Sequence, residues 1–344
     1  MEDYLSRKEM DSIQKQGGYF PRHWSYSTTN DYVITQVALG LEEAGVFDFL
    51  RKEKATTTSI AKTLNINEYL LDSCLNFLWS VTNAIEKNPD NTFTLKDRDF
   101  ANPFYIIKAY KSVFDNIGPA LQMKIKYGDD IRRDGAYLQR SSEIVTRSGV
   151  RNTIDRMPRD ISYLVDLGCG SAESLIYFCK SADNRHGHGI DIDSLTALKA
   201  RNNIASNQLS ERISIAENDI LDTAKWKTLK FGLNTAILAS TILHELLAEN
   251  ENRLINFLRE LREFAYGSRL YILELDTPDF ESLKNEENEA KKLFFATYRL
   301  WHPFSAQGMP MGKDSWEKLL KRAGLHIDRI RKSEYELNAF ECIL

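Results

Sequence analysis

One stretch of ten residues constrains the fold of this chain more than any other. Residues 163–172 read Tyr-Leu-Val-Asp-Leu-Gly-Cys-Gly-Ser-Ala, an apolar run that ends in an acidic residue and two alternating glycines. Apolar residues at helical spacing follow, at Leu175, Ile176 and Phe178. This order predicts a buried parallel strand, a tight turn and a helix. The glycines would let the backbone approach a ligand, and the helix N-terminus would offer it free N–H groups.

The residues around this turn bear on which ligand it takes. A dinucleotide-binding turn has a third glycine three residues after the second, and Glu173 occupies that position. A carboxylate there disfavours a pyrophosphate. Asp166, at the end of the strand, suits instead a cofactor with a cationic end.

Three further apolar runs lead into polar residues. The run over 188–193 reads as a strand that ends at Asp191, about 20 residues after the glycine turn, where such folds place an acid on ribose hydroxyls. The runs over 213–216 and 235–239 read as the next two strands. The first of them leads into Asn218 and Asp219.

This ordered set resembles class I S-adenosylmethionine (SAM) methyltransferases, whose motif I reads Asp/Glu-x-Gly-x-Gly-x-Gly. Ala172 replaces the last glycine of that motif. The resemblance covers roughly residues 145–344 and implies a Rossmann-like, seven-stranded α/β fold in which a terminal hairpin, over 326–330 and 339–344, inserts a strand into an otherwise parallel sheet. It also implies SAM as the cofactor, bound by Asp166, Gly168, Gly170, Asp191, Asn218, Asp219 and Ser240.

Composition excludes several classes of function. The 344 residues are 42% hydrophobic and 27% charged, which is typical of a soluble globular protein long enough for two domains. No apolar run reaches 18 residues and no signal-peptide pattern is present, so neither a membrane partner nor secretion is expected. The four cysteines lack CxxC spacing and predict reduced thiols in a cytoplasmic protein. A net charge of −4 gives no general attraction to nucleic acid.

Residues 1–100 are predicted to form a separate, mostly helical domain. Helical spacing over 30–50, 58–64 and 67–80, followed by a hairpin over 81–95, indicates a winged helix. The helix that would read DNA, over 67–80, has no lysine or arginine, which disfavours DNA binding. The domain resembles the dimerisation domain of small-molecule O-methyltransferases, which implies a homodimer. Aromatic residues among the first 30 predict that part of this segment packs: Tyr19, Phe20, Trp24 and Tyr26.

A helical connection is predicted over 101–150, before the Rossmann-like domain of 151–344. Most of its basic residues are expected on solvated faces. In the resembled family the connecting helices line the substrate pocket, so Arg132 or Arg133 is a candidate to hold a substrate carboxylate.

His244 is the first candidate for catalysis. It follows the fourth predicted strand, where open α/β sheets bind ligands. The segment Leu243-His244-Glu245 resembles the Leu-His-Asp segment of the O-methyltransferases, whose histidine is the general base that deprotonates a phenol. An imidazole with a pKa of about 6.5 suits that task.

His302 suggests a different chemistry. It lies in an aromatic, otherwise apolar segment that includes Trp301, Pro303 and Phe304. Two histidines from separate segments can share a transition metal and leave positions open for substrate. The pair His244 and His302 resembles the metal-dependent C-methyltransferases of 2-oxo acids, which implies iron or zinc.

The first hypothesis is therefore C-methylation at C3 of a 2-oxo acid, through a metal-stabilised enediolate. Glu245 would act beside the metal or accept a proton, and Arg299 or a connecting arginine would hold a carboxylate. The alternative is a metal-free O-methyltransferase of a phenolic or hydroxylated small molecule, with His244 as base. A SAM-binding protein without turnover is the third hypothesis.

Overall fold

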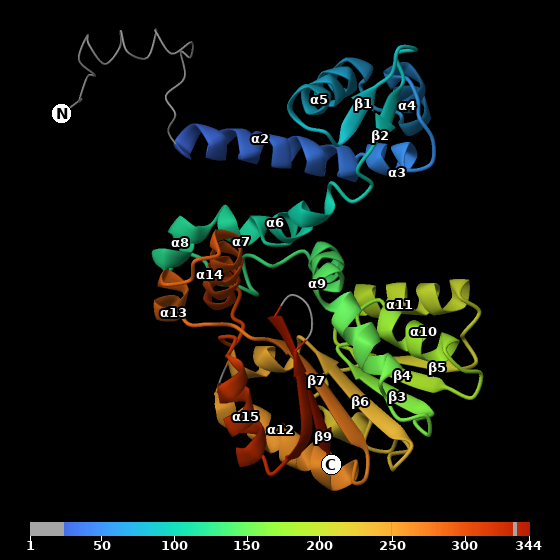
Figure 1. The fold of residues 1–344 in the computed structure, drawn as a ribbon, viewed down its shortest axis with the longest axis vertical. Coiled ribbons are helices and arrows are strands. Elements are labelled where there is room, and N and C mark those ends of the chain that lie inside the picture. The colour runs from blue at the N-terminus through green and yellow to red at the C-terminus, as the bar shows by residue number, and fades with distance from the viewer. Residues whose placement is uncertain (1–23, 249, 333–335) are drawn as a thin grey trace, which may run out of the picture. The chain divides into compact units, whose positions relative to one another are not determined.

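A computed structural model describes residues 24–248, 250–332 and 336–344. The chain divides into two compact units, one ending at Tyr105 and the other spanning Ile106–Leu344 (Figure 1). The helices that follow Tyr105 thus belong to the second unit. Tyr19 and Phe20, which were expected to pack, lie outside the described residues.

The first unit contains the predicted helices and hairpin, with one difference. A single helix was expected over residues 30–50, but Gly45 has a φ of 76° and separates two helices. Glycine adopts this left-handed conformation at little cost, so the chain turns there. The elements are α2 (Trp24–Glu43), α3 (Val46–Leu50), α4 (Thr57–Leu64), α5 (Glu68–Val81), β1 (Ile85–Lys87), β2 (Phe93–Leu95) and the 3-10 helix η1 (Asn102–Phe104).

The second unit is built on a seven-stranded sheet, as predicted. Its strands are β3 (Tyr163–Leu167), β4 (His186–Asp191), β5 (Ile213–Glu217), β6 (Thr235–Ser240), β7 (Arg269–Leu275), β8 (His326–Lys332) and β9 (Leu337–Ile343). They lie in the order β5-β4-β3-β6-β7-β9-β8. The first five run parallel, and β9 pairs antiparallel with both β7 and β8. The predicted insertion of a terminal strand into a parallel sheet is confirmed.

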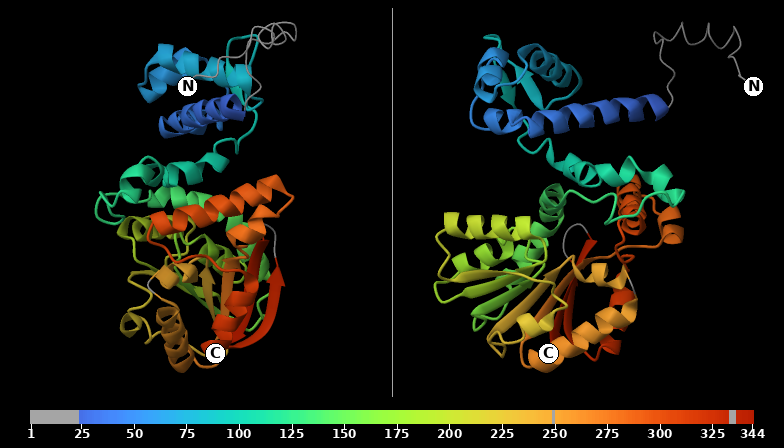
Figure 2. Two further views of the ribbon diagram at one scale, coloured as in Figure 1. Left: turned by 90° about the vertical axis from the view of Figure 1, so that its left-hand side faces the viewer. Right: turned by 180° about the vertical axis from the view of Figure 1, so that it is seen from behind.

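Helices cover both faces of this sheet (Figures 1 and 2). One face is covered by α9 (Gly135–Asp155), α10 (Glu173–Lys180) and α11 (Ser194–Ser206), and the other by α12 (Glu251–Phe264) and α15 (Lys313–Arg322). The remaining helices are α6 (Tyr105–Ala109), α7 (Lys111–Phe114), α8 (Ile117–Leu121), α13 (Phe280–Lys284) and α14 (Glu289–Phe304), with 3-10 helices η2 (Thr223–Lys225) and η3 (Leu243–Ala248).

The central strands are buried on both faces, because successive side chains point to opposite sides of a sheet. Val165 and Ile237 pack in a cluster with α12 and α15. Their neighbours Leu164 and Leu238 pack in a second cluster with α9, α10 and α11. This burial on both faces explains why the apolar runs of these strands are continuous and do not alternate with polar residues. Because β3, β4 and β6 run parallel, their carboxyl ends lie at the same edge of the sheet.

The aromatic segment that contains His302 forms the C-terminal end of α14, with Pro303 next to the last residue of the helix. All four cysteines are free thiols. Among the helices of the described ranges, none combines the length and apolar character needed to cross a membrane.

Candidate functional site

The turn between β3 and α10 has the conformation that its glycines allow. Gly168 and Gly170 have φ values of 69° and 54°, and Ala172 also lies in the left-handed region, with a φ of 66°. A side chain at Gly168 would be strained by the positive φ, and its Cβ would lie 3.0 Å from Cγ1 of Ile242, which is a tight contact. The N–H of Gly170 donates to Oδ2 of Asp191 at 3.0 Å, which joins the turn to the end of β4.

A cavity of about 390 Å³, the first cavity, opens over this turn. Five of the seven residues predicted to bind the cofactor line it: Asp166, Gly168, Gly170, Asp191 and Ser240. Asn218 and Asp219 do not. The N–H of Asn218 donates to the carbonyl oxygen of Asp191 at 3.0 Å, and the Asp219 carboxylate accepts the N–H of Leu221 at 2.9 Å.

The titratable groups that line the first cavity are mainly acidic. Two guanidinium groups line it, those of Arg132 and Arg133. Six carboxyl groups also line it, those of Glu143, Asp166, Glu173, Asp191, Asp193 and Glu245. Burial and the neighbouring Asp191 raise the pKa of Asp166 to about 8. Burial likewise raises the pKa of Asp191. This cavity therefore suits a ligand with positive charge better than a pyrophosphate.

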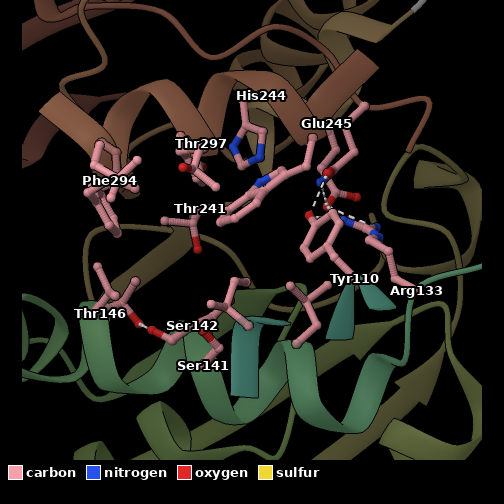
Figure 3. Close-up of a pocket in the computed structure, with 18 of the residues that line it drawn as sticks. Tyr110, Arg133, Ser141, Ser142, Thr146, Thr241, His244, Glu245, Phe294 and Thr297 are labelled. Atoms are coloured by element: carbon pink, nitrogen blue, oxygen red, sulfur yellow. Dashed lines mark hydrogen bonds and ion pairs between the residues drawn. The ribbon is translucent and has the colours of Figure 1, made fainter. Parts of the chain in front are cut away.

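A second cavity, of about 430 Å³, adjoins the first. Hydroxyl groups of α9 lie on one side, at Ser141, Ser142 and Thr146, and Phe294 and Thr297 of α14 lie opposite them (Figure 3). The residues that line both cavities are Arg133, Leu138, Ser142, Thr146, Thr241 and Glu245. Further apolar walls are Ile106, Val145, Leu275, Leu293 and Trp301.

His244 lines the second cavity and is held by a carboxylate. Its Nδ1 lies 2.9 Å from Oε2 of Glu274, and its backbone N–H donates to Oε1 of the same residue at 3.2 Å. A carboxylate partner assigns the proton to Nδ1 and leaves Nε2 as the acceptor. Burial lowers the pKa of His244, but the buried Glu274 carboxylate outweighs it and raises the pKa above its ordinary value.

His302 packs against the ring of His244 and does not line the second cavity. The two rings have their centroids 5.2 Å apart and an interplanar angle of 61°. Nδ1 of His302 bonds to the carbonyl oxygen of Tyr298, and Nε2 is buried without a partner among the described residues. Burial, together with His244, lowers the pKa of His302 to about 3, so its ring is neutral.

These two imidazoles do not belong to a larger ligand set. Within residues 24–248, 250–332 and 336–344, no three His, Cys, Asp or Glu side chains are grouped as a metal site. The structure thus brings the predicted histidine pair together, but supplies no third protein ligand in the described part of the chain.

Glu245 is part of a hydrogen-bond network at the boundary of the two cavities (Figure 3). Its Oε1 lies 3.3 Å and 3.4 Å from the two terminal nitrogens of Arg133. The same oxygen accepts the amide of Gln307 at 2.6 Å, and the hydroxyl of Tyr110 donates to Oε1 of Gln307 at 2.9 Å. Arg133 is one of the two arginines that the sequence suggested as partners of a substrate carboxylate. It lines the second cavity, but its charge is already paired with that of Glu245.

The structure does not bring Arg299 to this site. Its guanidinium donates to the carbonyl oxygen of Pro310 at 3.1 Å and lies over the ring of Phe280. It lines a different cavity, near Asp276 and Lys313. The sequence had suggested Arg299 as a residue that holds a substrate carboxylate, but α14 directs its side chain away from the second cavity.

Sequence reasoning missed Glu274, which is 2% exposed. Its signal was a single carboxylate inside the otherwise apolar run of β7, because such a group is buried only with a partner. It also missed Tyr110 and Gln307, whose residue types carry no such signal.

The comparisons with known proteins show the fold. No family model matches the chain, and no curated protein sequence matches it. Among solved structures, the mitomycin 7-O-methyltransferase MmcR has a TM-score of 0.63 and 16% identity, over 93% of this chain and 97% of that one. Human N-acetylserotonin methyltransferase in complex with SAM has a TM-score of 0.67 and 14% identity, over 95% and 99%.

A third similar structure is the N,N-8-amino-8-demethyl-D-riboflavin dimethyltransferase RosA from Streptomyces davawensis. It has a TM-score of 0.60 and 19% identity, over 94% of this chain and 99% of that one. The chain thus has the fold of the SAM-dependent methyltransferases with an N-terminal helical domain. At these identities, the likeness concerns the fold alone.

Proposed function

We propose that this protein is a SAM-dependent methyltransferase that methylates an oxygen of an uncharged, hydroxylated small molecule. One observation carries the proposal: His244, fixed by Glu274 with Nε2 as its acceptor nitrogen, lines a cavity that adjoins the cavity at the glycine turn. A base and a cofactor turn on adjoining cavities are what transfer to a hydroxyl group requires.

The residues of the first cavity fit SAM. SAM carries a sulfonium and an ammonium group against one carboxylate, so its net charge complements the excess of carboxylates there. Asp191, at the end of β4, would accept from ribose hydroxyls. Arg132 is the candidate for the cofactor carboxylate, because Arg133 is already paired with Glu245. When bound, SAM supplies an electrophilic methyl group.

The second cavity supplies the acceptor side of the reaction. Its apolar walls would hold an aromatic or alicyclic skeleton and exclude water, which strengthens the electrostatic contacts inside. Nε2 of His244 would take the proton of the acceptor hydroxyl as the oxygen becomes nucleophilic. Glu274 would stabilise the resulting imidazolium, as a buried carboxylate does for a neighbouring cation.

A second candidate, metal-assisted C-methylation of a 2-oxo acid, has one observation in its favour. In both histidines Nδ1 is hydrogen-bonded to an oxygen, so Nε2 of each ring is left as an acceptor. Nε2 of His302 is buried without a partner among the described residues. Metal-binding histidines commonly donate their other ring N–H in this way. Iron or zinc held there would act as a Lewis acid toward the substrate.

The two candidates are separated by one experiment on the purified chain. We expect methyl transfer from SAM to a member of a phenol panel in the presence of EDTA, and a loss of about 10²–10⁴-fold in His244→Gln. The exposed His186, changed to Gln, is the matched control and should keep full activity.

The opposite result would support the second candidate. In that case the chain would turn over only 2-oxo acids, and EDTA would abolish this activity. The purified chain would also contain about one iron or zinc ion, and both His244→Gln and His302→Gln would lose it. Absence of methyl transfer to either panel, with no SAM bound, would contradict both candidates.

A further inference from the structure

We propose that Glu245 determines whether the second cavity prefers charged or uncharged acceptors. Because Glu245 neutralises Arg133, the cavity selects uncharged molecules. This inference rests on the proposed function, because it takes the second cavity as the acceptor site. It assigns Glu245 to specificity, whereas the sequence had suggested a part in the chemistry.

Arg133 is the only lysine or arginine among the described residues that line the second cavity. Its side chain is 16% exposed, and the Glu245 side chain is 32% exposed. The other hydrogen-bond partners of its guanidinium are neutral: Nε donates to the hydroxyl of Tyr127 at 2.9 Å, and a terminal nitrogen lies 3.4 Å from that of Tyr110. Removal of the charge on Glu245 would therefore leave one uncompensated positive charge on the cavity wall.

The Glu245 carboxylate is held in place by a second group. Gln307 donates to Oε1 at 2.6 Å, and Gln307 is in turn fixed by Tyr110 and by Ser305, which donate to its Oε1 at 2.9 Å and 2.8 Å. Because an amide oxygen can also accept from Gln307, Glu245→Gln removes the charge with little change of shape. The substitution is thus a test of charge and not of packing.

The balance between the charges of Arg133 and Glu245 would strongly affect the binding of an acceptor that carries a carboxylate. Solvent screens charges on a cavity wall less than charges on an open surface, so a lone guanidinium attracts an anion there and a paired one does not. With Glu245 in place, an anionic acceptor would have to share Arg133 with a fixed carboxylate of like charge. An uncharged hydroxyl compound meets no such repulsion.

The test measures binding of two matched probes to the full chain by isothermal titration calorimetry at pH 7. The probes are 2-naphthol, which is neutral, and 6-hydroxy-2-naphthoate, which adds one carboxylate to the same skeleton. The proteins are the wild type, Glu245→Gln, and the double variant Glu245→Gln with Arg133→Gln, which restores a net charge of zero at this pair. Thermal unfolding confirms that each variant is folded.

We expect the wild type to prefer 2-naphthol. Glu245→Gln should shift the ratio of the two affinities toward the anion by on the order of tenfold, with 2-naphthol nearly unchanged. The double variant should return the ratio to about that of the wild type. A ratio that stays constant in Glu245→Gln, or an equal gain for both probes, would overturn the proposal.

Two further outcomes are decisive. Displacement of the naphthoate by S-adenosylhomocysteine would place the anion in the first cavity and would also overturn the proposal. Binding of neither probe to any of the three proteins would refute the second cavity as an acceptor site. Since the readout is binding, a failure of methyl transfer would contradict the proposed function without altering the measured ratio.

Discussion

The carboxylate of Glu274 contacts His244 twice, with one oxygen 2.9 Å from the ring Nδ1 and the other 3.2 Å from the backbone nitrogen. The two residues come from adjacent segments of the fold, the end of β7 and the turn η3 after β6. One buried side chain therefore fixes both the position of the turn and the tautomer of the ring that it carries.

The first prediction concerns Glu274→Gln. Burial lowers the pKa of His244 and Glu274 raises it further than burial lowers it, so removal of the carboxylate should lower that pKa. A general base acts in its neutral form, so the rising limb of kcat/KM against pH should move to lower pH. The maximal rate should fall about 10²-fold or more, because the imidazolium loses its partner. A pH–rate profile measures both effects.

The control for that profile is Glu263→Gln, an exposed glutamate of α12. It should leave the profile unchanged. A Glu274→Gln enzyme with the wild-type profile would show that His244 is not the base.

The second prediction concerns Asp166, whose pKa burial and Asp191 raise to about 8. Below that pH the group is mainly protonated, and a cationic ligand favours its ionised form. Binding of SAM should therefore release protons, and the affinity for SAM should increase as pH rises from 7 through 8. Asp166→Asn should remove this dependence. Calorimetry in buffers of different ionisation enthalpy measures the proton release.

S-adenosylhomocysteine is the matched ligand for this measurement, because it lacks the sulfonium charge. Its affinity should depend less on pH than that of SAM. Equal dependence for the two ligands would show that Asp166 does not respond to the sulfonium.

The third prediction concerns Gly308, which lies against the turn that carries His244. A Cβ there would overlap the carbonyl oxygen of His244 and lie 2.5 Å from Cβ of Leu247. Gly308→Ala should lower the free energy of unfolding by about 1–3 kcal/mol and displace the turn. Denaturant unfolding measures the first effect and turnover the second.

Gly312→Ala is the control for Gly308→Ala. A Cβ at Gly312 would lie 3.5 Å from Oδ1 of Asp276, which is an ordinary contact. Stability and turnover should both stay near the wild type. Equal effects of the two substitutions would argue against a close contact at Gly308.

The fourth prediction concerns His302→Phe. The low pKa of His302 keeps its ring neutral, so a phenyl ring of similar size would preserve the packing against His244 and Tyr298. If the reaction is metal-free, turnover should stay within about tenfold of the wild type, against a loss of about 10²–10⁴-fold in His244→Phe. A complete loss in both variants, measured with the same phenol, would favour the two-histidine metal site.

The sheet and the edge at which its parallel strands end together were predictable, whereas the partners of the site residues were not. The apolar runs of β3 and β6 and the residues that follow them were visible in the chain, and parallel strands align their carboxyl ends. By contrast, the pairing of His244 with Glu274 joins residues that are 30 positions apart. Neither segment contains a sequence pattern that predicts its pairing with the other.

The error at Arg299 has a simple geometric cause. Residues three and four apart share a face of a helix, so Leu293, Thr297 and Trp301 line the second cavity together. Arg299 is displaced from that face by the rotation of about 100° per residue. Because the segment was not predicted to be helical, this phase was not available from the sequence.

The position of β9 has a consequence for the order in which the protein is made. β9 lies between β7 and β8, although it is the last of the seven strands to be synthesised. Until residues 337–343 leave the ribosome, β7 has an open edge with unpaired N–H and C=O groups beside an apolar core. Translation of the roughly 60 residues that separate the two strands takes about 3–12 s at about 5–20 residues per second. During that interval the nascent chain exposes a surface that can pair with another copy, so slow translation of this region would favour aggregation.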